Sequence, residues 1–174
     1  MAERPDLSTF EAVVLPHLPA AYNLARWLTK NDSDADDVVQ DACIRSLRYF
    51  GSFRGGDARA WLLAIVRNSC YSFLRQRRRE EPMTEILEDE PPGASGEDPE
   101  TILLAGQRAE RLTQLIEELP VVYREVLVLR ELEGLSYKEI GIVTELPLGT
   151  VMSRLARARK RLQHALEAHN GCAS

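Results

Sequence analysis

The stretch LSYKEIGIVTELPLGTVMSRLARARKRL, residues 135–162, predicts two helices joined by a short turn. Ser136 and Glu139 form the S-x-x-E pattern of a capping box, so the first helix is expected to begin beside them. The segment ELPL, residues 145–148, interrupts the helical pattern and predicts the turn. Two helices joined in this way are typical of a helix-turn-helix, whose second helix usually enters the major groove of DNA.

The second helix of this motif is expected to carry two different stripes of side chains. At about 100° per residue, one narrow apolar stripe contains Val151, Leu155, Ala158 and Leu162. About 90° away by the same rotation, a second stripe contains Thr150, Arg154, Arg157 and Arg161, with Ser153, Lys160 and His164 beside it. Arginine forks match guanine edges and cations attract phosphates. Because a short capped helix and a turn precede it, this face favours DNA binding over a merely solvated basic surface.

This basic helix belongs to a chain of 174 residues whose net charge is −5. Residues 81–101 explain much of the acidity, since they contain eight acidic residues, four prolines, two glycines and no basic residue. Such a segment cannot bury enough apolar surface to fold alone. We therefore predict a flexible acidic linker over residues 81–101, between two helical domains.

Helical patterns fill the sequence on both sides of this linker. In the first domain they cover residues 9–30, 33–50 and 58–79. Pro16 and Pro19 lie near the start of the first pattern, and Ser33 with Asp36 predicts a capping box for the second. The glycine-bearing segment GSFRGGD, residues 51–57, predicts a break.

The second domain begins with helical patterns over residues 102–119 and 120–134, separated by Pro120 and followed by Gly134. Hydrophobic residues make up 44% of the chain, which is enough to bury a core. Only 6% of the residues are aromatic, and leucine, alanine and arginine dominate, which favours helices over strands. The predicted fold class is therefore all-α, with two small helical domains over residues 1–80 and 102–174.

Several classes of protein are disfavoured by the composition. Cys43, Cys70 and Cys172 lie far apart and form no metal-ligand spacing with the histidines, which indicates two core cysteines, one tail thiol and a reduced, cytosolic compartment. No signal-peptide run occurs, and no stretch approaches the roughly 20 apolar residues of a membrane span. No phosphate-binding glycine loop or nucleophile–base signature is present. We expect no catalytic residues, no cofactor and no bound metal.

Three segments together resemble a known family, the bacterial sigma factors. Residues 135–162 are similar to the family's C-terminal promoter-binding domain. Residues 32–50, DSDADDVVQDACIRSLRYF, resemble its polymerase-binding helix, and residues 58–79 resemble the helix that melts and recognises the −10 element. Their order, spacing and size fit the extracytoplasmic-function (ECF, group IV) subgroup of the sigma-70 superfamily, which keeps only domains 2 and 4.

The resemblance implies a function that the residues alone do not. The protein would bind core RNA polymerase and direct promoter-specific transcription initiation, and it would not be an enzyme. Residues 1–80 would form domain 2 and residues 102–174 domain 4. An anti-sigma factor would be a further partner, in a stress response, and the protein would be cytoplasmic without membrane insertion.

The resemblance also implies site residues. In the −35 recognition helix they are Thr150, Ser153, Arg154, Arg157, Arg159, Lys160 and Arg161. In the −10 loop and helix they are Phe53, Arg54, Gly55, Gly56, Asp57, Ala58, Asn68, Arg75, Arg77, Arg78 and Arg79. The polymerase would contact Asp36, Asp37, Gln40 and Asp41, although compensation of the helix dipole also accounts for the first two. Trp61 is expected in the core, and Met152 and Ala156 depart from the side chains common in the family.

Two other interpretations remain open at this stage. A helix-turn-helix regulator could bind DNA without polymerase, and retention by core polymerase would distinguish it from a sigma factor. A protein-interaction module could use the acidic and basic helices for protein partners, and salt-sensitive DNA binding by the holoenzyme would argue against it. An enzyme is a distant third.

Overall fold

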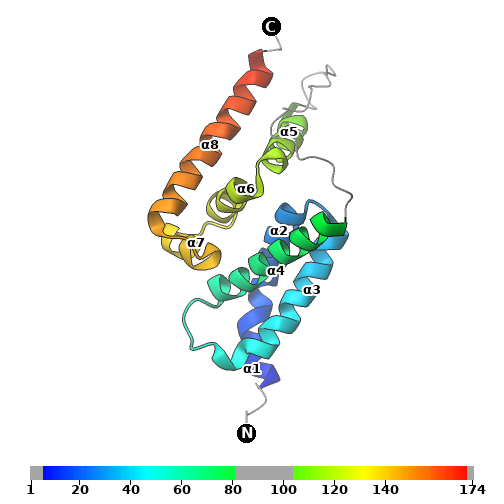
Figure 1. Cartoon of the computed structure of the whole chain (residues 1–174), viewed down its shortest axis with the longest axis vertical. Coiled ribbons are helices and arrows are strands. Elements are labelled where there is room, and N and C mark those ends of the chain that lie inside the picture. The colour runs from blue at the N-terminus through cyan, green and yellow to red at the C-terminus, as the bar shows by residue number, and fades with distance from the viewer. Residues whose placement is uncertain (1–5, 81–103, 172–174) are drawn as a thin grey trace.

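The computed structural model describes residues 6–80 and 104–171, and the regular elements within them are helical (Figure 1). The first half contains α1 Leu7–Val14, η1 Leu15–His17, α2 Leu18–Thr29, α3 Asp32–Tyr49, η2 Phe50–Ser52 and α4 Ala58–Glu80. The second half contains α5 Leu104–Glu118, α6 Val121–Leu127, η3 Val128–Leu132, α7 Tyr137–Thr144 and α8 Leu148–Gly171. The all-α prediction is confirmed, whereas the predicted linker, residues 81–101, lies outside the described residues.

Two prolines divide the first predicted helical segment. Pro16 is the second residue of the 3-10 turn η1, and Pro19 is the second residue of α2. Proline has no backbone N–H and its ring clashes with the preceding turn, so an uninterrupted α-helix cannot pass through either position. The segment is helical as predicted, but it bends into α1, η1 and α2.

The predicted capping box of α3 is wrong. The N-cap is Asn31, whose side chain accepts a hydrogen bond from the backbone N–H of Asp34, and Ser33 and Asp36 lie inside the helix. Lys30 ends α2 in the left-handed conformation (φ 59°), which leaves Asn31 extended, as a cap residue must be. Asparagine caps a helix as well as serine does. Asn31 precedes Ser33 and serves as the N-cap, so α3 begins at Asp32.

The capping box of α7 is confirmed. The Ser136 hydroxyl accepts a hydrogen bond from the Glu139 backbone N–H at 3.2 Å, and the Glu139 carboxylate accepts one from the Ser136 backbone N–H at 2.7 Å. Glu145 ends the helix in the left-handed conformation (φ 56°), and α8 begins three residues later at Leu148. The predicted helix-turn-helix is therefore α7, a short turn and α8.

Removing the α7 cap is expected to destabilise the protein modestly. Ser136→Ala leaves the Glu139 N–H without its side-chain acceptor and should lower the free energy of unfolding by about 1 kcal/mol, measured by urea denaturation. Ser153→Ala is the matched control, because the exposed Ser153 hydroxyl only donates to the Thr150 carbonyl within α8. Equal denaturation midpoints for the two variants would contradict the importance of the cap.

The second half is organised around α6. The helix predicted over residues 120–134 consists of α6 followed by the π-helical turn η3, with Pro120 as the cap residue and Gly134 (φ 67°) beyond the end. The buried Arg124 donates from Nη1 to the carbonyls of Glu117 and Leu119, at 2.6 and 3.1 Å, and so satisfies the last turn of α5. α8 packs along α6.

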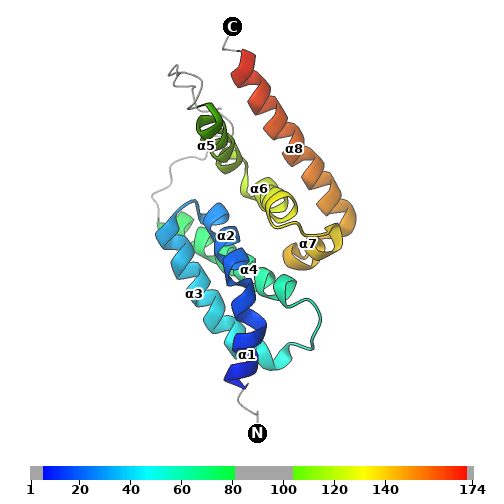
Figure 2. The same cartoon turned by 180° about the vertical axis from the view of Figure 1, so that it is seen from behind.

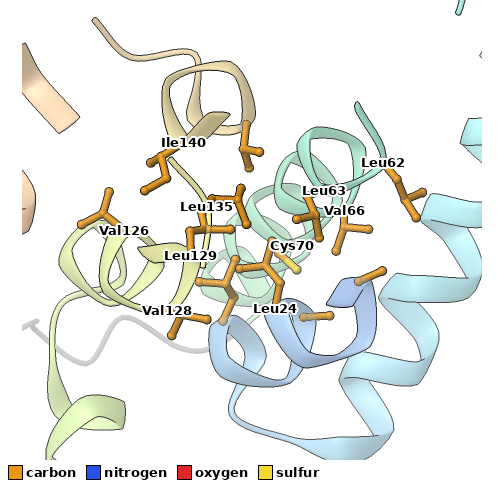
Figure 3. Packing of buried hydrophobic residues seen from close by; sticks show 14 of the residues in the cluster. Leu24, Leu62, Leu63, Val66, Cys70, Val126, Val128, Leu129, Leu135 and Ile140 are labelled. Atoms are coloured by element: carbon orange, nitrogen blue, oxygen red, sulfur yellow. The ribbon is translucent and has the colours of Figure 1, made fainter. Parts of the chain in front are cut away.

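The two halves pack against each other and share one apolar core. Figures 1 and 2 show α7 beside the N-terminal part of α4, and contacts also join α2 to α6. In Figure 3 the side chains of Val128 and Leu129 lie near Leu24, and Leu135 faces Leu63 and Val66. The structure thus brings the two predicted domains into direct contact, an arrangement that no local pattern in the sequence indicates.

Cys70 and Cys43 differ in burial. Cys70 is fully buried in this core, and burial raises the pKa of its thiol to about 12, so the thiol stays protonated near neutral pH. Cys43 is half-buried, and burial raises its pKa as well. Cys172 lies outside the described residues. Cys70 is therefore a core cysteine as predicted.

Candidate nucleic-acid interface

The apolar stripe of α8 seats the helix on the second half. Val151, Leu155 and Ala158 are at most 1% exposed, and Leu162 is half-buried. This confirms the predicted core stripe. Because that stripe is fixed against the neighbouring helices, the remaining surface of α8 is held facing solvent. Ser153, Arg157, Lys160 and Arg161 are exposed there, and Met152 is 50% exposed.

Arg154 differs from the other basic residues of the predicted stripe. Its side chain is only 27% exposed, and Nη1 lies 4.0 Å from Oε1 of Glu125 in α6. Glu125 is completely buried. Thr150, at the start of the same stripe, is half-buried. Arg154 therefore reaches toward the interior as well as toward the surface, because a buried carboxylate lies beneath it.

Arg159 also has an acidic neighbour. Its Nε donates to Oε1 of Glu131 in η3 at 3.0 Å. The hydrogen bond to Glu131 raises the pKa of Arg159, which remains charged. Part of its charge is neutralised within the protein, so Arg159 is less available to phosphate than Arg157 or Lys160.

A basic hollow lies where α8 meets α6. It is lined by Tyr123, Arg157, Lys160, Arg161 and His164. The Arg161 guanidinium lies 4.9 Å from the centre of the Tyr123 ring, a cation–π contact that limits its freedom. Tyr123 was not identified from the sequence, because it lies on α6, far along the chain from the residues it meets. The hollow combines several cations in the way that contact with a phosphate backbone requires.

The glycine-bearing loop connects η2 to α4. Gly55 and Gly56 have φ values of 85° and 94°, a conformation that other residues rarely adopt. The carboxylate of Asp57 accepts the Ala60 backbone N–H at 3.0 Å, and this bond lowers the pKa of Asp57. Asp57 thus caps the N-terminus of α4. The loop itself is exposed at Arg54, Gly55 and Gly56.

Aromatic side chains anchor this loop. Phe53 packs against Trp61, with ring centres 5.0 Å apart, and Phe50 lies 6.0 and 6.2 Å from the two rings. Trp61 is half-buried in this cluster. Trp61 was predicted in the core, and the structure places it half-buried and packed against the core. Phe53 holds the loop against α4.

The exposed part of α4 carries the remaining predicted −10 residues. Asn68, Arg75, Arg78 and Arg79 are exposed, and Arg75 and Arg79 line a shallow hollow with Ser72 and Gln76. Arg77 differs, because it forms an ion pair with Asp34 of α3 and lies over the Phe73 ring. The C-terminal part of α4 therefore presents a polar and cationic surface to solvent.

The predicted polymerase-binding residues lie together on α3. Asp36, Asp37, Gln40 and Asp41 are all exposed, and their spacing places them on one side of the helix. Asp41 forms an ion pair with Arg45 at 2.7 Å. The helix dipole does not account for Asp41, but this i,i+4 pair gives it a local partner. The acidic surface of α3 is formed by Asp36, Asp37, Gln40 and Asp41.

None of the helices within residues 6–80 and 104–171 combines the length and the apolar character needed to cross a membrane.

Known families match both halves of the chain. Residues 13–80 match the family model of Sigma-70 region 2, and residues 109–162 match that of Sigma-70, region 4. The RNA polymerase sigma-H factor of Pseudomonas aeruginosa is 34% identical over 173 residues, which cover 95% of this chain and 90% of that protein. The ECF RNA polymerase sigma-E factor of Escherichia coli K12 is 35% identical over 142 residues, covering 77% and 74% respectively.

Solved structures of similar chains contain bound proteins. The sigma factor RpoE of Bartonella quintana, in complex with the anti-sigma factor NepR, has a TM-score of 0.71 and 29% identity, over 91% of this chain and 97% of that chain. CnrH, in complex with the cytosolic domain of CnrY, has a TM-score of 0.67 and 27% identity, over 94% and 91%.

Proposed function

Because this chain belongs to the extracytoplasmic-function sigma factors of bacterial RNA polymerase, we propose that it binds core polymerase and directs transcription initiation at promoters with matching −10 and −35 elements. Sigma factors are not enzymes themselves. The match of both regions, in order, disfavours the alternative of a DNA-binding regulator that acts without polymerase.

The exposed basic surface of α8 is the observation that carries this proposal. It follows a capped helix and a turn, and it places Arg157, Lys160 and Arg161 in solvent while the apolar stripe is buried. Arg157 has the donor geometry that suits a guanine edge, and its neighbours suit phosphates. Thr150, Ser153, Arg154 and Arg159 complete the proposed −35 surface, with Arg154 and Arg159 also bound to acidic residues within the protein.

The first half would act at the −10 element. The exposed loop around Gly55 and Gly56 and the exposed amide of Asn68 support this role, since an amide can both donate to and accept from an unpaired base. Arg75, Arg78 and Arg79 would neutralise backbone phosphates. We propose residues 1–80 as domain 2 and residues 102–174 as domain 4.

The acidic surface of α3 would bind the polymerase through complementary basic groups. The solved relative from Bartonella quintana has a bound anti-sigma factor, which supports control of this chain by such a partner in a stress response. The protein would work in the cytoplasm, where promoter DNA and polymerase are found.

Run-off transcription with core polymerase on a genomic promoter library would test the proposed function. We expect transcripts from a limited set of promoters that share two sequence elements. Core polymerase alone should not produce them. If the protein neither bound core polymerase nor changed the set of transcripts, the proposed function would be wrong.

Reversing charge on the acidic surface of α3 is expected to weaken polymerase binding. Asp37→Lys with Asp41→Lys should lower the affinity for core polymerase by roughly tenfold or more, because like charges would then meet at the interface. A titration of labelled protein with core polymerase measures the change. Glu110→Lys with Glu118→Lys changes the net charge equally at exposed positions of α5 and serves as the control. Equal affinities for both double variants would remove the assignment.

A further inference from the structure

A buried ion pair joins the two halves of the chain. Arg67 in α4 donates to both carboxylate oxygens of Glu125 in α6, from Nε at 2.9 Å and from Nη2 at 3.2 Å. The Arg67 side chain is 16% exposed and Glu125 is completely buried. The Arg67 guanidinium also lies 4.1 Å from the centre of the Tyr71 ring. This is the two-pronged geometry in which an arginine binds a carboxylate most strongly.

Glu125 cannot easily remain without a cationic partner. A buried carboxylate that loses its partner is strongly destabilising, more so than the pair itself is stabilising. The same pair affects Arg67: burial disfavours its charge, but the hydrogen bond and charge of Glu125 raise the pKa of Arg67 above its usual value. Arg67 therefore remains a cation in the interface, and separating the halves requires Glu125 to find another partner or water.

A second cation, Arg154, lies beside Glu125 in the closed chain. Nη1 of Arg154 lies 4.0 Å from Oε1 of Glu125. Arg154 and Glu125 belong to the same half of the chain, whereas Arg67 belongs to the other. Consequently Arg154 stays next to Glu125 when Arg67 leaves. An arginine has five N–H donors, so Arg154 can bind Glu125 with one edge and leave other donors toward the surface of α8.

The contacts between the halves also limit which DNA they can contact together. Arg59, at the start of α4, lies 3.8 Å from the Glu139 carboxylate at the start of α7, and it donates to the Glu133 carbonyl at 3.3 Å. The −10 loop and the helix-turn-helix are therefore adjacent. By their names the two promoter elements lie about 25 base pairs apart, on the order of 85 Å at 3.4 Å per pair. The closed chain cannot span that distance on a straight duplex.

We propose that Glu125 is a latch with two alternative partners: Arg67 binds it while the halves are closed, and Arg154 replaces Arg67 when the halves separate. The exchange couples separation of the halves to the position of α8, because Arg154, the replacement partner of Glu125, lies on that helix. Arg154 thereby acts as a positioning residue for α8 in the open chain. The purpose of this opening rests on the proposed function, but the exchange itself involves only residues of this chain.

The closed partner is tested by a distance measurement in the full chain. Two spin labels report the separation of the halves, one at the exposed position Arg48 in α3 and one at Gln163 in α8. Each label is attached to a non-natural amino acid, so that the native cysteines remain unlabelled. Arg67→Met should increase the open population roughly tenfold or more, since it leaves Glu125 buried without Arg67. Arg67→Lys keeps the positive charge but cannot bind both carboxylate oxygens as a guanidinium does. It should increase the open population less than Arg67→Met.

A second ion pair between the halves provides the matched control. Arg26 in α2 lies 3.3 Å from Glu117 in α5, and its side chain is 34% exposed. Arg26→Met should change the open population less than about twofold, because the Arg26–Glu117 pair is more exposed than Arg67–Glu125, and because Arg26 also binds Asp32 within its own half. If Arg67→Met opened the chain no more than Arg26→Met, Glu125 would not be a latch. Retained helicity, measured by circular dichroism, is required of each variant.

The exchange of partners is tested by comparing two backgrounds. Arg154→Met should lower the folding equilibrium constant in both backgrounds. The factor should be at least about ten times larger in the Arg67→Met protein than in the wild type, because Arg154 is the partner of Glu125 when Arg67 is absent. Arg157→Met, exposed on the same helix, should have equal effects in both backgrounds. Equal effects of Arg154→Met in both would overturn the exchange. Neither polymerase nor DNA is involved, so that result would leave the proposed function standing.

Discussion

Leu155→Ala is expected to lower the free energy of unfolding by about 2–5 kcal/mol. Leu155 is 1% exposed and lies at the centre of the buried stripe that holds α8 on α6 and α7. Its truncation removes apolar contacts and leaves a cavity, because the surrounding helices relax only partly. Urea denaturation followed by circular dichroism measures the change. α8, the proposed recognition helix, would lose its fixed orientation, so −35 recognition should weaken as well.

Met152→Ala is the matched control for this variant. Met152 lies on the same helix, only three residues away, but it is 50% exposed. Its truncation should change the free energy of unfolding by no more than about 0.5 kcal/mol. If both variants had the same stability, the buried stripe of α8 would not be what holds the recognition helix in place.

Arg157→Ala is expected to weaken −35 recognition by about 1–3 kcal/mol. Arg157 is exposed, lines the basic hollow beside Tyr123, and lies on the stripe of α8 about 90° from the core stripe. Loss of the proposed bidentate contact to a guanine should lower the preference for the cognate −35 sequence over a mutated one. Competition binding of the holoenzyme to the two promoters measures that preference, and retention by core polymerase should be unchanged.

Arg108→Ala removes the same charge at an exposed position of α5 and controls for net charge. It should leave the preference between the two promoters unchanged. The opposite pattern for Arg157→Ala, in which polymerase retention is lost and promoter choice is spared, would show that the residue serves the polymerase interface instead.

Local signals in the sequence predicted most helices because those signals act within a few residues. The capping box of α7 and the apolar stripe of α8 depend on residues three or four positions apart, and both are confirmed. The cap of α3 failed for a local reason as well. Asn31 and Ser33 were both suitable caps, and the left-handed end of α2 at Lys30 decided between them.

The candidate site was less predictable from the sequence, because side-chain partners come from distant segments. Arg77 pairs with Asp34, and Arg159 pairs with Glu131, so the charges of two predicted DNA-binding arginines are partly neutralised within the protein. Arg154 lies beside Glu125 for the same kind of reason. Periodicity shows which side of a helix a residue occupies, but it does not show what lies opposite that side.

The sequence by itself determined the helical class, the helix-turn-helix and the exposure of Arg157 and Lys160, because helix period and caps arise from neighbouring residues. Only the tertiary structure decided that the two halves close on one another, with Leu24 and Leu63 packed near Leu129 and Leu135. It also decided that Arg67 meets Glu125. Such contacts join residues tens of positions apart, and their energy depends on burial that exists only once both halves are assembled.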